Sequence, residues 1–303
     1  NPGTVDEAHL AGLRRLGFNR ISFGVQSFHD DELRTLERIH DAREVEDAYR
    51  WAREAEFDNV NLDLIYGLQG QSLAGWQTNL EMALALGPEH VSLYALTLEE
   101  GTPLTRDVAR GRSLGPDLDL QADMFEWSRD RMAAAGYEHY EVSNWARPER
   151  QCQHNLIYWR NDDWLGLGAG AHSHLFDERF AGAASPSRYI ALVGEQAASD
   201  TAITDESVVS SMRHVVMREP AERDRELAET VILALRLREG LDIEAYRDRF
   251  GLDIRDVFGD AIQETVELGL TELVDGRLRL RDSAVLLGDE AFMRFLKPAS
   301  VDA

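Results

Sequence analysis

The sequence predicts an α/β fold, in which parallel strands and helices form part of a (β/α) barrel and a helical, winged-helix-like domain follows. Three observations support this fold class. The first hundred residues repeat a unit made of a helix and a short β-rich run. Polar and apolar residues alternate within those runs. Near the C-terminal end, three helical segments precede a hairpin with an Asp-Gly turn, which favours a winged-helix arrangement.

The repeated units define the barrel part. Strands separated by helices of this length are typical of βαβ units, whose strands run parallel. The expected order is helix 6–16, strand 20–26, helices at about 30–39 and 43–55, strand 59–65, helix 74–86 and strand 90–96.

The alternation within these strands is unusual, because parallel strands buried on both faces are normally almost entirely apolar. Ser22 and Gln26 share one face of the first strand, and Asn61 and Asp63 share one face of the second. A barrel filled with branched apolar side chains would not show this pattern. The sequence therefore indicates an interior that holds a ligand. A sheet with one solvated face is the alternative.

The second half of the chain changes character after a helix at 117–135 and a strand at 137–142. Residues 143–176 are rich in Gly, Asn, His and Trp, which predicts structured loops at one rim of the barrel. A boundary near 200–208 divides the chain into two expected domains, 1–204 and 205–303. The second domain is expected to contain helices at about 222–238, 242–249 and 254–268 and a hairpin at 272–280.

Composition restricts the class of protein. The chain has 303 residues, 44% of them hydrophobic, and a formal net charge of −23. Such an acidic chain is a poor partner for nucleic acid, which is bound through clustered Lys and Arg. No apolar run approaches the roughly 18 residues of a membrane span, and nothing reads as a signal peptide. We therefore expect a cytoplasmic protein.

Cysteine usage excludes two kinds of cross-link. Cys152 is the only cysteine, so an internal disulfide and a cysteine-only metal site built by this chain are both excluded. The residues Asn1-Pro2-Gly3 read as the exit of a strand into a turn. This start predicts that an N-terminal segment has been removed.

Several short sequence words, taken in order, resemble a known family. The barrel half of the coproporphyrinogen-oxidase-like radical S-adenosylmethionine (SAM) family is resembled by Asn1–Val5, Gly17–Phe28, Asn61–Leu68 and Ser92–Tyr94. Its HemW-type heme chaperone branch is resembled by Tyr140–Ala146, His154–Trp159 and Gly166–Ser173, and its small terminal domain by Leu235–Leu241. The chain is thus similar to a HemW-type heme chaperone with a partial radical-SAM-type barrel.

The resemblance implies cofactors and site residues. It implies that Gln26, Arg38 and Asp63 bind SAM and that His154 binds heme. It also implies a [4Fe-4S] cluster, but the three cluster cysteines of the family would precede Asn1, so this chain alone should not cleave SAM. No catalytic residue and no cluster ligand is assigned here, and whether the protein is an enzyme stays open. The implied partners are heme and an unknown heme-acceptor protein.

Plainer roles exist for these residues. Arg38 could be an ordinary surface arginine, whereas Asp63 within an apolar strand is harder to dismiss, because burying an unpaired carboxylate is costly. His154 beside aromatic residues could be structural, or it could ligate heme iron through one ring nitrogen. Cys152 could be a second ligand, a covalent attachment point or simply buried.

Two further features leave roles open. His172 and His174 are expected to form hydrogen bonds in a glycine-rich loop and not to bind a metal. Gln69 and Ser72 replace Pro and Thr in a family loop, which loosens that loop without removing a catalytic group.

The leading hypothesis is a heme-binding and heme-transfer protein. The alternative is an oxygen-independent coproporphyrinogen-III oxidase, an enzyme of porphyrin biosynthesis that decarboxylates propionate side chains. The His-Asn-x-x-Tyr-Trp pattern at 154–159 is typical of the chaperone branch and not of the oxidases. A barrel enzyme unrelated to SAM fits the coarse βα pattern but leaves the ordered words unexplained.

Overall fold

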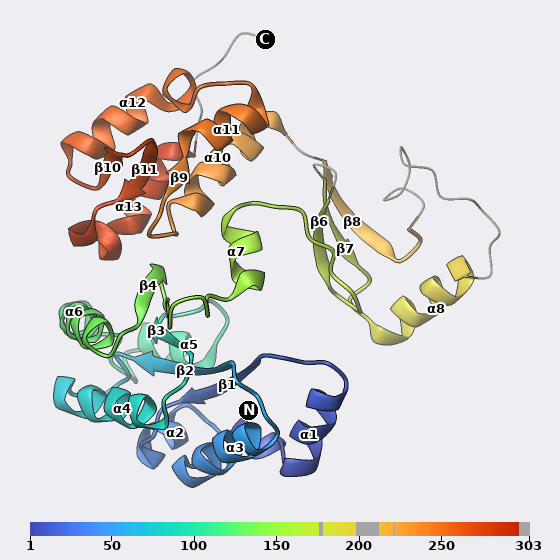
Figure 1. The fold of residues 1–303 in the computed structure, drawn as a ribbon, viewed down its shortest axis with the longest axis vertical. Helices are drawn as coiled ribbons and strands as arrows, with labels where there is room; N and C mark the ends of the chain where they lie inside the picture. The colour runs from blue at the N-terminus through green and yellow to red at the C-terminus, as the bar shows by residue number, and fades with distance from the viewer. Residues whose placement is uncertain (176–177, 198–211, 221, 297–303) are drawn as a thin grey trace. The chain divides into compact units, whose positions relative to one another are not determined.

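A computed structural model describes residues 1–175, 178–197, 212–220 and 222–296 (Figure 1). The chain divides into two compact units, Asn1–Gln151 and Cys152–Ala303, called unit 1 and unit 2 below. The boundary expected between residues 204 and 205 lies outside the described residues.

Unit 1 has the alternating order of helices and strands that the sequence predicts. A five-stranded sheet forms its centre, with strand order β1-β2-β3-β5-β4. Its elements are η1 (Pro2–Thr4), α1 (Glu7–Arg15), β1 (Ile21–Gln26), α2 (Asp30–Thr35), α3 (Ala42–Glu54), β2 (Val60–Tyr66), α4 (Leu73–Leu86), β3 (His90–Ala95), α5 (Pro103–Ala109), α6 (Leu118–Ala134), β4 (Glu138–Glu141) and β5 (Asn144–Ala146).

The first three strands are parallel, as predicted. β1 pairs with β2, and β2 with β3, in a register that sets Gly24 beside Asp63 and Asn61 beside His90. The fourth expected strand, at 137–142, is present as β4, but it reaches the sheet through β5, which runs antiparallel to β3. The β4–β5 hairpin therefore takes the place of a fourth parallel strand.

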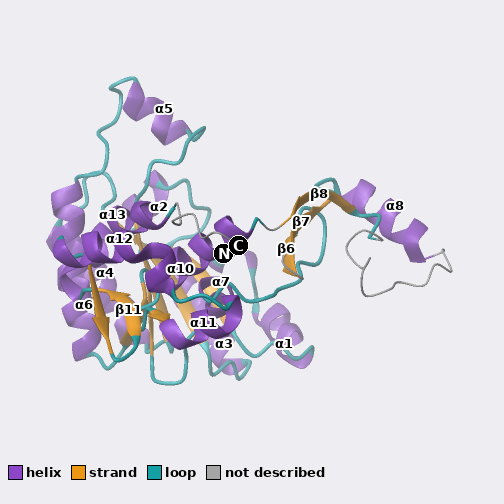
Figure 2. Cartoon of the chain, turned by 90° about the horizontal axis from the view of Figure 1, so that it is seen from above, coloured by secondary structure: helices purple, strands orange, loops and turns teal. Residues whose placement is uncertain are grey.

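The two faces of the parallel strands have opposite chemistry. One face carries the fully buried side chains of Leu62 and Leu64, and it packs against α3 and α4. The other, called the polar face below, carries Ser22, Asn61, Asp63, His90 and Ser92. In Figure 2, α5 stands apart from the helices beside the sheet, in line with its having no buried residue.

Unit 2 contains two three-stranded sheets, with orders β6-β7-β8 and β10-β11-β9. Its described elements are α7 (Gln153–Trp159), β6 (His172–Leu175), β7 (Glu178–Gly182), α8 (Pro186–Ala197), β8 (Val215–Pro220), α10 (Arg223–Ala234), β9 (Leu241–Asp242), α11 (Ile243–Phe250), α12 (Ile254–Glu267), β10 (Thr271–Val274), β11 (Arg277–Leu280), η3 (Asp282–Leu287), α13 (Gly288–Phe292) and η4 (Met293–Phe295).

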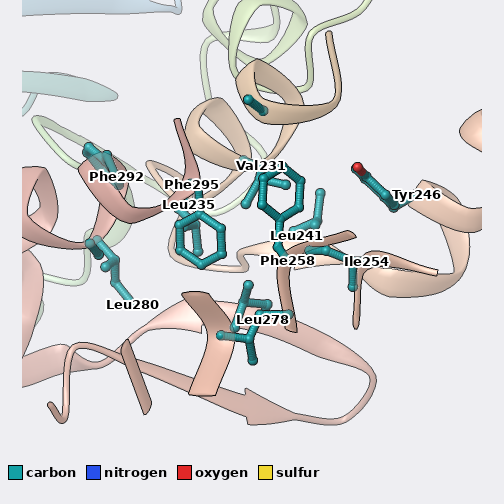
Figure 3. Packing of buried hydrophobic residues seen from close by; sticks show 14 of the residues in the cluster. Val231, Leu235, Leu241, Tyr246, Ile254, Phe258, Leu278, Leu280, Phe292 and Phe295 are labelled. Carbon is teal, nitrogen blue, oxygen red and sulfur yellow. The ribbon is translucent and has the colours of Figure 1, made fainter. Parts of the chain in front are cut away.

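The C-terminal part of unit 2 has the winged-helix-like arrangement that the sequence predicts. Helices α10, α11 and α12 precede the hairpin of β10 and β11, whose turn residues Asp275 and Gly276 both have positive φ, as a type I′ turn requires. Apolar side chains from these helices and from β11 form one core, in which Phe258 and Phe295 meet edge to face (Figure 3).

The interval 143–176 is more regular than expected. Instead of loops alone, it contains β5, α7 and β6. Helix α7 has seven residues and only one buried side chain, Leu156. Two turns of helix with one apolar contact give too little hydrophobic periodicity to recognise in a sequence.

Candidate functional site

Asp63 lies on the polar face in the middle of β2 and is held by two neighbours. The side-chain amide of Asn61 donates to Asp63 Oδ1 at 2.7 Å, and the Ser22 hydroxyl donates to Asp63 Oδ2 at 3.0 Å. Each carboxylate oxygen can accept a second hydrogen bond. Asp63 is therefore fixed in orientation and can still accept from a ligand hydroxyl or ammonium group.

Gln26 ends β1 in an unusual backbone conformation. Its φ is +67°, and the pairing of β1 with β2 shifts by one residue between Gly24 and Gln26. The Gln26 amide nitrogen lies 3.0 Å from the point where a Cβ on Gly24 would stand. Gly24 pairs with Asp63, so the Gln26 amide lies on the same face as Asp63, as the sequence predicts. A left-handed glutamine is strained, and such strain is concentrated at functional sites.

Arg38 lies beyond the end of α2, which stops at Thr35 and is shorter than the expected helix. Two residues later, buried His40 donates from Nε2 to the carbonyl oxygen of Val25 at 3.1 Å, so this segment returns to the end of β1. Within the described part of the chain, no hydrogen bond or ion pair joins Arg38 to Gln26 or Asp63. The structure thus places Gln26 and Asp63 on one face of the sheet, and the Arg38 guanidinium has no hydrogen bond or ion pair among the described residues.

The loop after β2 is held by Gln71, a residue that the sequence analysis did not single out. Its side-chain oxygen accepts from the backbone N–H groups of Gly67 and Leu68 at 2.8 and 3.3 Å. Its amide donates to both carboxylate oxygens of Glu32 at 3.1 Å. Ser72 caps α4 by accepting from the backbone of Gly75. Four buried or half-buried hydrogen bonds therefore order a loop that Gln69 was expected to loosen.

The polar face fits the polar part of SAM, judged by the groups it offers. SAM presents ribose hydroxyls and an α-ammonium group, which need acceptors, and an α-carboxylate, which needs a cation. On this face Asp63 supplies acceptors. Arg38, in the segment after α2, carries a cation, but no contact found among the described residues places it on the polar face. No hydrogen bond of the Gln26 side chain is found among the described residues, so its amide is also available.

His154 lies in the first turn of α7 and is exposed. Its Nε2 lies 3.1 Å from the Tyr158 hydroxyl, one helical turn along, and the two rings meet edge to face at 4.9 Å. The Tyr158 ring in turn meets Trp164 at 4.9 Å. One surface therefore combines an accessible imidazole with two aromatic rings.

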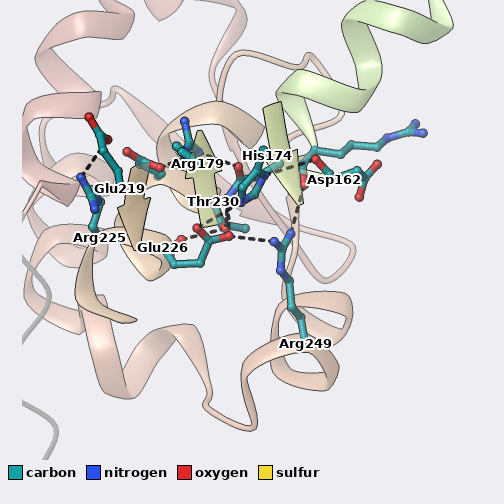
Figure 4. Close-up of polar contacts among 11 residues, drawn as sticks. Asp162, His174, Arg179, Glu219, Arg225, Glu226, Thr230 and Arg249 are labelled. Carbon is teal, nitrogen blue, oxygen red and sulfur yellow. Dashed lines mark hydrogen bonds and ion pairs between the residues drawn. The ribbon is translucent and has the colours of Figure 1, made fainter. Parts of the chain in front are cut away.

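The other candidate residues of unit 2 are more deeply placed, His172 excepted. Cys152 is buried at the N-terminal end of α7, and His172 is exposed on β6. His174 is buried, with Nδ1 3.4 Å from the Asp162 carbonyl oxygen and Nε2 3.7 Å from the Glu226 carboxylate (Figure 4). Glu226 also accepts from Asn161 and Arg249 at 2.8 Å. His174 thus belongs to a polar cluster that joins β6 to α10.

Neither a metal-ligand cluster nor a membrane-spanning helix is found among the described residues. No group of three or more His, Cys, Asp or Glu side chains there could hold a metal ion. None of the helices in that part of the chain is long and apolar enough to cross a membrane.

Sequence reasoning missed the other half of the polar face. His90 and Tyr140 are buried there and hydrogen-bonded to each other, and neither was a candidate residue. A signal was present, because His90 has the same strand phase as the polar Ser92, two residues along the third strand.

Two family models match the chain. The radical SAM superfamily matches residues 1–83, which hold β1, β2 and most of α4, and the HemN C-terminal domain matches residues 222–287. In the solved structures, the coproporphyrinogen III oxidase HemN of Escherichia coli has a TM-score of 0.75 over 97% of this chain and 68% of that chain. At 22% sequence identity, this likeness shows the fold.

Curated relatives are more similar in sequence. The heme chaperone HemW of Bacillus subtilis is 32% identical over 298 residues, covering 98% of this chain and 74% of the relative. HemW of Lactococcus lactis is 31% identical, with 98% and 74% covered, and HemW of Escherichia coli is 45% identical over 57% of this chain and 44% of its own length. These relatives favour the chaperone branch over the oxidase alternative. The chain belongs to the HemW family within the radical SAM superfamily.

Proposed function

We propose that this protein binds heme and transfers it to an acceptor protein, as the name heme chaperone describes for its relatives. The observation that carries the proposal is the α7 surface, where an exposed His154 lies beside Tyr158 and Trp164. A neutral imidazole binds heme iron through one ring nitrogen, and flat aromatic rings give a porphyrin apolar contact. Exposure suits transfer, because the ligand must be released to a second protein.

The hydrogen bond between Tyr158 and His154 sets a condition on heme binding. In the tautomer whose Nε2 is unprotonated, the hydroxyl donates to Nε2, and the lone pair that would bind iron is then occupied. Rotation of the Tyr158 hydroxyl or of the imidazole frees it. Both rings are at the surface, so this rearrangement disturbs little of the core.

The same proposal assigns SAM to the polar face of unit 1. Asp63 would accept from SAM donor groups, Arg38 would pair with its carboxylate, and the Gln26 amide would contact the ligand beside Asp63. In the radical SAM superfamily the cluster supplies an electron to SAM, and Asp63, Arg38 and Gln26 would bind and orient the ligand.

The cytoplasm is the proposed compartment, and cell fractionation tests it.

Absorption spectroscopy of the full-length protein tests the heme site. We expect stoichiometric heme binding with a Soret band typical of imidazole ligation, and we expect His154→Ala to shift or abolish that band. His172→Ala is the matched control, because His172 is also an exposed histidine of unit 2. This control should change the spectrum much less.

Thermal unfolding of the same variants separates ligation from structure. His154 is exposed, so His154→Ala should leave the unfolding temperature nearly unchanged. An unchanged heme spectrum together with a markedly lower unfolding temperature would show that His154 is structural and would overturn the assignment.

A further inference from the structure

A buried histidine lies on the polar face beside the proposed SAM site. His90 is the first residue of β3 and has no solvent exposure. Its Nδ1 lies 2.6 Å from Asn61 Oδ1, and its Nε2 lies 2.8 Å from the Tyr140 hydroxyl. Both ring nitrogens are therefore hydrogen-bonded, which fixes the ring. Burial, and next the charge of Arg20, lower the pKa of His90 from 6.5 to about 3, so the ring is neutral at pH 7.

The direction of every hydrogen bond follows from Asp63 outward. An ionised carboxylate only accepts, so the amide nitrogen of Asn61 faces Asp63 and its oxygen faces His90. An amide oxygen only accepts, so the proton of the neutral His90 ring is on Nδ1. Nε2 must then be the acceptor, and the Tyr140 hydroxyl donates to it. Asp63 thus selects one tautomer of His90 through the Asn61 side chain that lies between them.

Ser22 closes the arrangement on the other side. The Asn61 amide also donates to the Ser22 oxygen at 2.7 Å, and the Ser22 hydroxyl donates to Asp63 Oδ2. One connected set of hydrogen bonds therefore crosses the sheet from Tyr140 on β4, through β3 and β2, to β1. These hydrogen bonds lie toward the N-terminal ends of the parallel strands. Barrel proteins bind their ligands at the C-terminal ends of the strands. The set therefore supports Asp63 from the side opposite the expected ligand.

We propose that His90 and Tyr140 are positioning residues, which hold Asp63 in one orientation through Asn61. The proposal rests on the proposed SAM site, of which Asp63 is part. Two donors keep the Asn61 oxygen turned away from the carboxylate: His90 Nδ1 at 2.6 Å and, at 3.2 Å, the Ser92 hydroxyl. The imidazole is the nearer of the two, so its loss removes the closer contact that fixes the amide. The Tyr140 hydroxyl links the β4–β5 hairpin to this set of hydrogen bonds.

SAM affinity of the full-length protein with its cluster reconstituted provides the first measurement. Tyr140→Phe removes one hydroxyl and should raise the dissociation constant of SAM by about fivefold, the size of one lost buried hydrogen bond. Tyr137→Phe is the matched control. Tyr137 is also a buried tyrosine of the same region, but its hydroxyl donates to the carbonyl oxygen of Pro88 at 2.5 Å, outside this set. The control should bind SAM as the unmodified protein does.

Nitrogen NMR of histidine without SAM provides the second measurement, which tests the direction of the hydrogen bonds. His90 should show the Nδ1–H tautomer with a hydrogen-bonded Nε2, assigned by loss of its signals in His90→Gln. Tyr140→Phe should shift the Nε2 signal to that of an unbonded nitrogen, and Asn61→Leu should remove the single-tautomer preference. An Nε2–H tautomer in the unmodified protein would overturn the proposal.

Asp63→Asn separates the proposed SAM site from the positioning role of His90 and Tyr140. If Asp63→Asn weakens SAM binding and Tyr140→Phe does not, the positioning proposal fails and the SAM site stands. If Asp63→Asn leaves SAM binding unchanged, the SAM site itself fails, and the positioning proposal fails with it. Weakened binding in Asp63→Asn and Tyr140→Phe, but not in Tyr137→Phe, supports both.

Discussion

The polar face of unit 1 and the α7 surface of unit 2 hold their candidate residues in opposite ways. Asp63 accepts two hydrogen bonds, and behind it His90 and Asn61 are buried and bonded on every side. His154 is exposed and shares one hydrogen bond with Tyr158. A ligand that must be oriented needs the first kind of site. A ligand that must be given away is better served by the second.

The largest loss of stability is expected at Gly67 of unit 1, where there is no room for a side chain. Gly67, directly after β2, has a φ of +73°, and a Cβ there would lie 2.4 Å from Gln121 Cγ. Gln121 is held by its bond to the Leu96 carbonyl oxygen at 2.9 Å. Gly67→Ala combines left-handed strain with a steric clash and should lower the free energy of unfolding by about 2–4 kcal/mol in urea titrations.

Gly87→Ala is the control for that measurement. Gly87 has a similar φ of +69° but nothing within 4 Å of an added Cβ. It should lose only the backbone contribution, about 1 kcal/mol. Equal losses in the two variants would mean that Gln121 yields freely and that this end of β2 is not rigid.

The second-largest expected effect is a pH dependence of the free energy of unfolding, caused by buried His90. The pKa of His90 is lowered from 6.5 to about 3, so the folded state binds a proton less readily than the unfolded state. Its contribution to stability is therefore complete above pH 6.5 and is lost as the pH falls toward 3. Between pH 7 and pH 5 the loss should be about 2 kcal/mol.

His90→Gln isolates this contribution, because glutamine does not titrate and can still donate and accept. The difference in unfolding free energy between the two proteins should change with pH over this range. A pH-independent difference for His90→Gln would contradict the assignment of a neutral, buried ring.

Much of the fold could be predicted because its periodicities are local. The period-two alternation at 20–26 and 59–65 identified β1, β2 and the polar face, and the Asp275-Gly276 turn identified the C-terminal hairpin. The hairpin of β4 and β5 could not be predicted in the same way. Whether β5 runs parallel or antiparallel depends on which strand it meets, and strands of three and four residues carry too little pattern to say.

The candidate sites were predictable to a different degree. Asp63 was proposed as a SAM-binding residue from the family resemblance, and a carboxylate in an apolar strand needs an explanation in any case. Tyr140 begins one of the segments that carry the family resemblance, but no role was predicted for it. Its partner His90 is 50 residues away in sequence. Contacts of that kind depend on strand order and register, which no local pattern reveals.

A smaller effect is expected from Gly24→Ala. The added Cβ would lie 3.0 Å from the Gln26 amide nitrogen, at the flexible end of that side chain, so the amide must move by a few tenths of an ångström. Stability should change by less than about 1 kcal/mol. SAM affinity should fall severalfold, which equilibrium binding measures. Unchanged affinity would show that Gln26 does not contact SAM.

The smallest effect on stability, and the sharpest test of the contrast, is expected from Tyr158→Phe. The variant keeps the aromatic ring beside His154 and Trp164 but removes the hydroxyl that is hydrogen-bonded to His154 Nε2. The bond is at the surface, so its loss should change the free energy of unfolding by less than about 0.5 kcal/mol. Removing the equivalent buried hydroxyl of Tyr140 should cost about 1 kcal/mol.

The two tyrosines should also differ in sign toward their ligands. In the tautomer whose Nε2 accepts from the hydroxyl, Tyr158→Phe frees the imidazole lone pair. Heme should then bind more tightly, by up to about fivefold if the hydrogen bond contributes about 1 kcal/mol in the free protein. Tyr140→Phe should weaken SAM binding, because there the hydroxyl supports the site and does not compete with the ligand. Heme titration followed by the Soret band measures the first change. Weaker heme binding in Tyr158→Phe would mean that the hydroxyl supports the bound heme, and the α7 surface would then be organised in advance, as the polar face is.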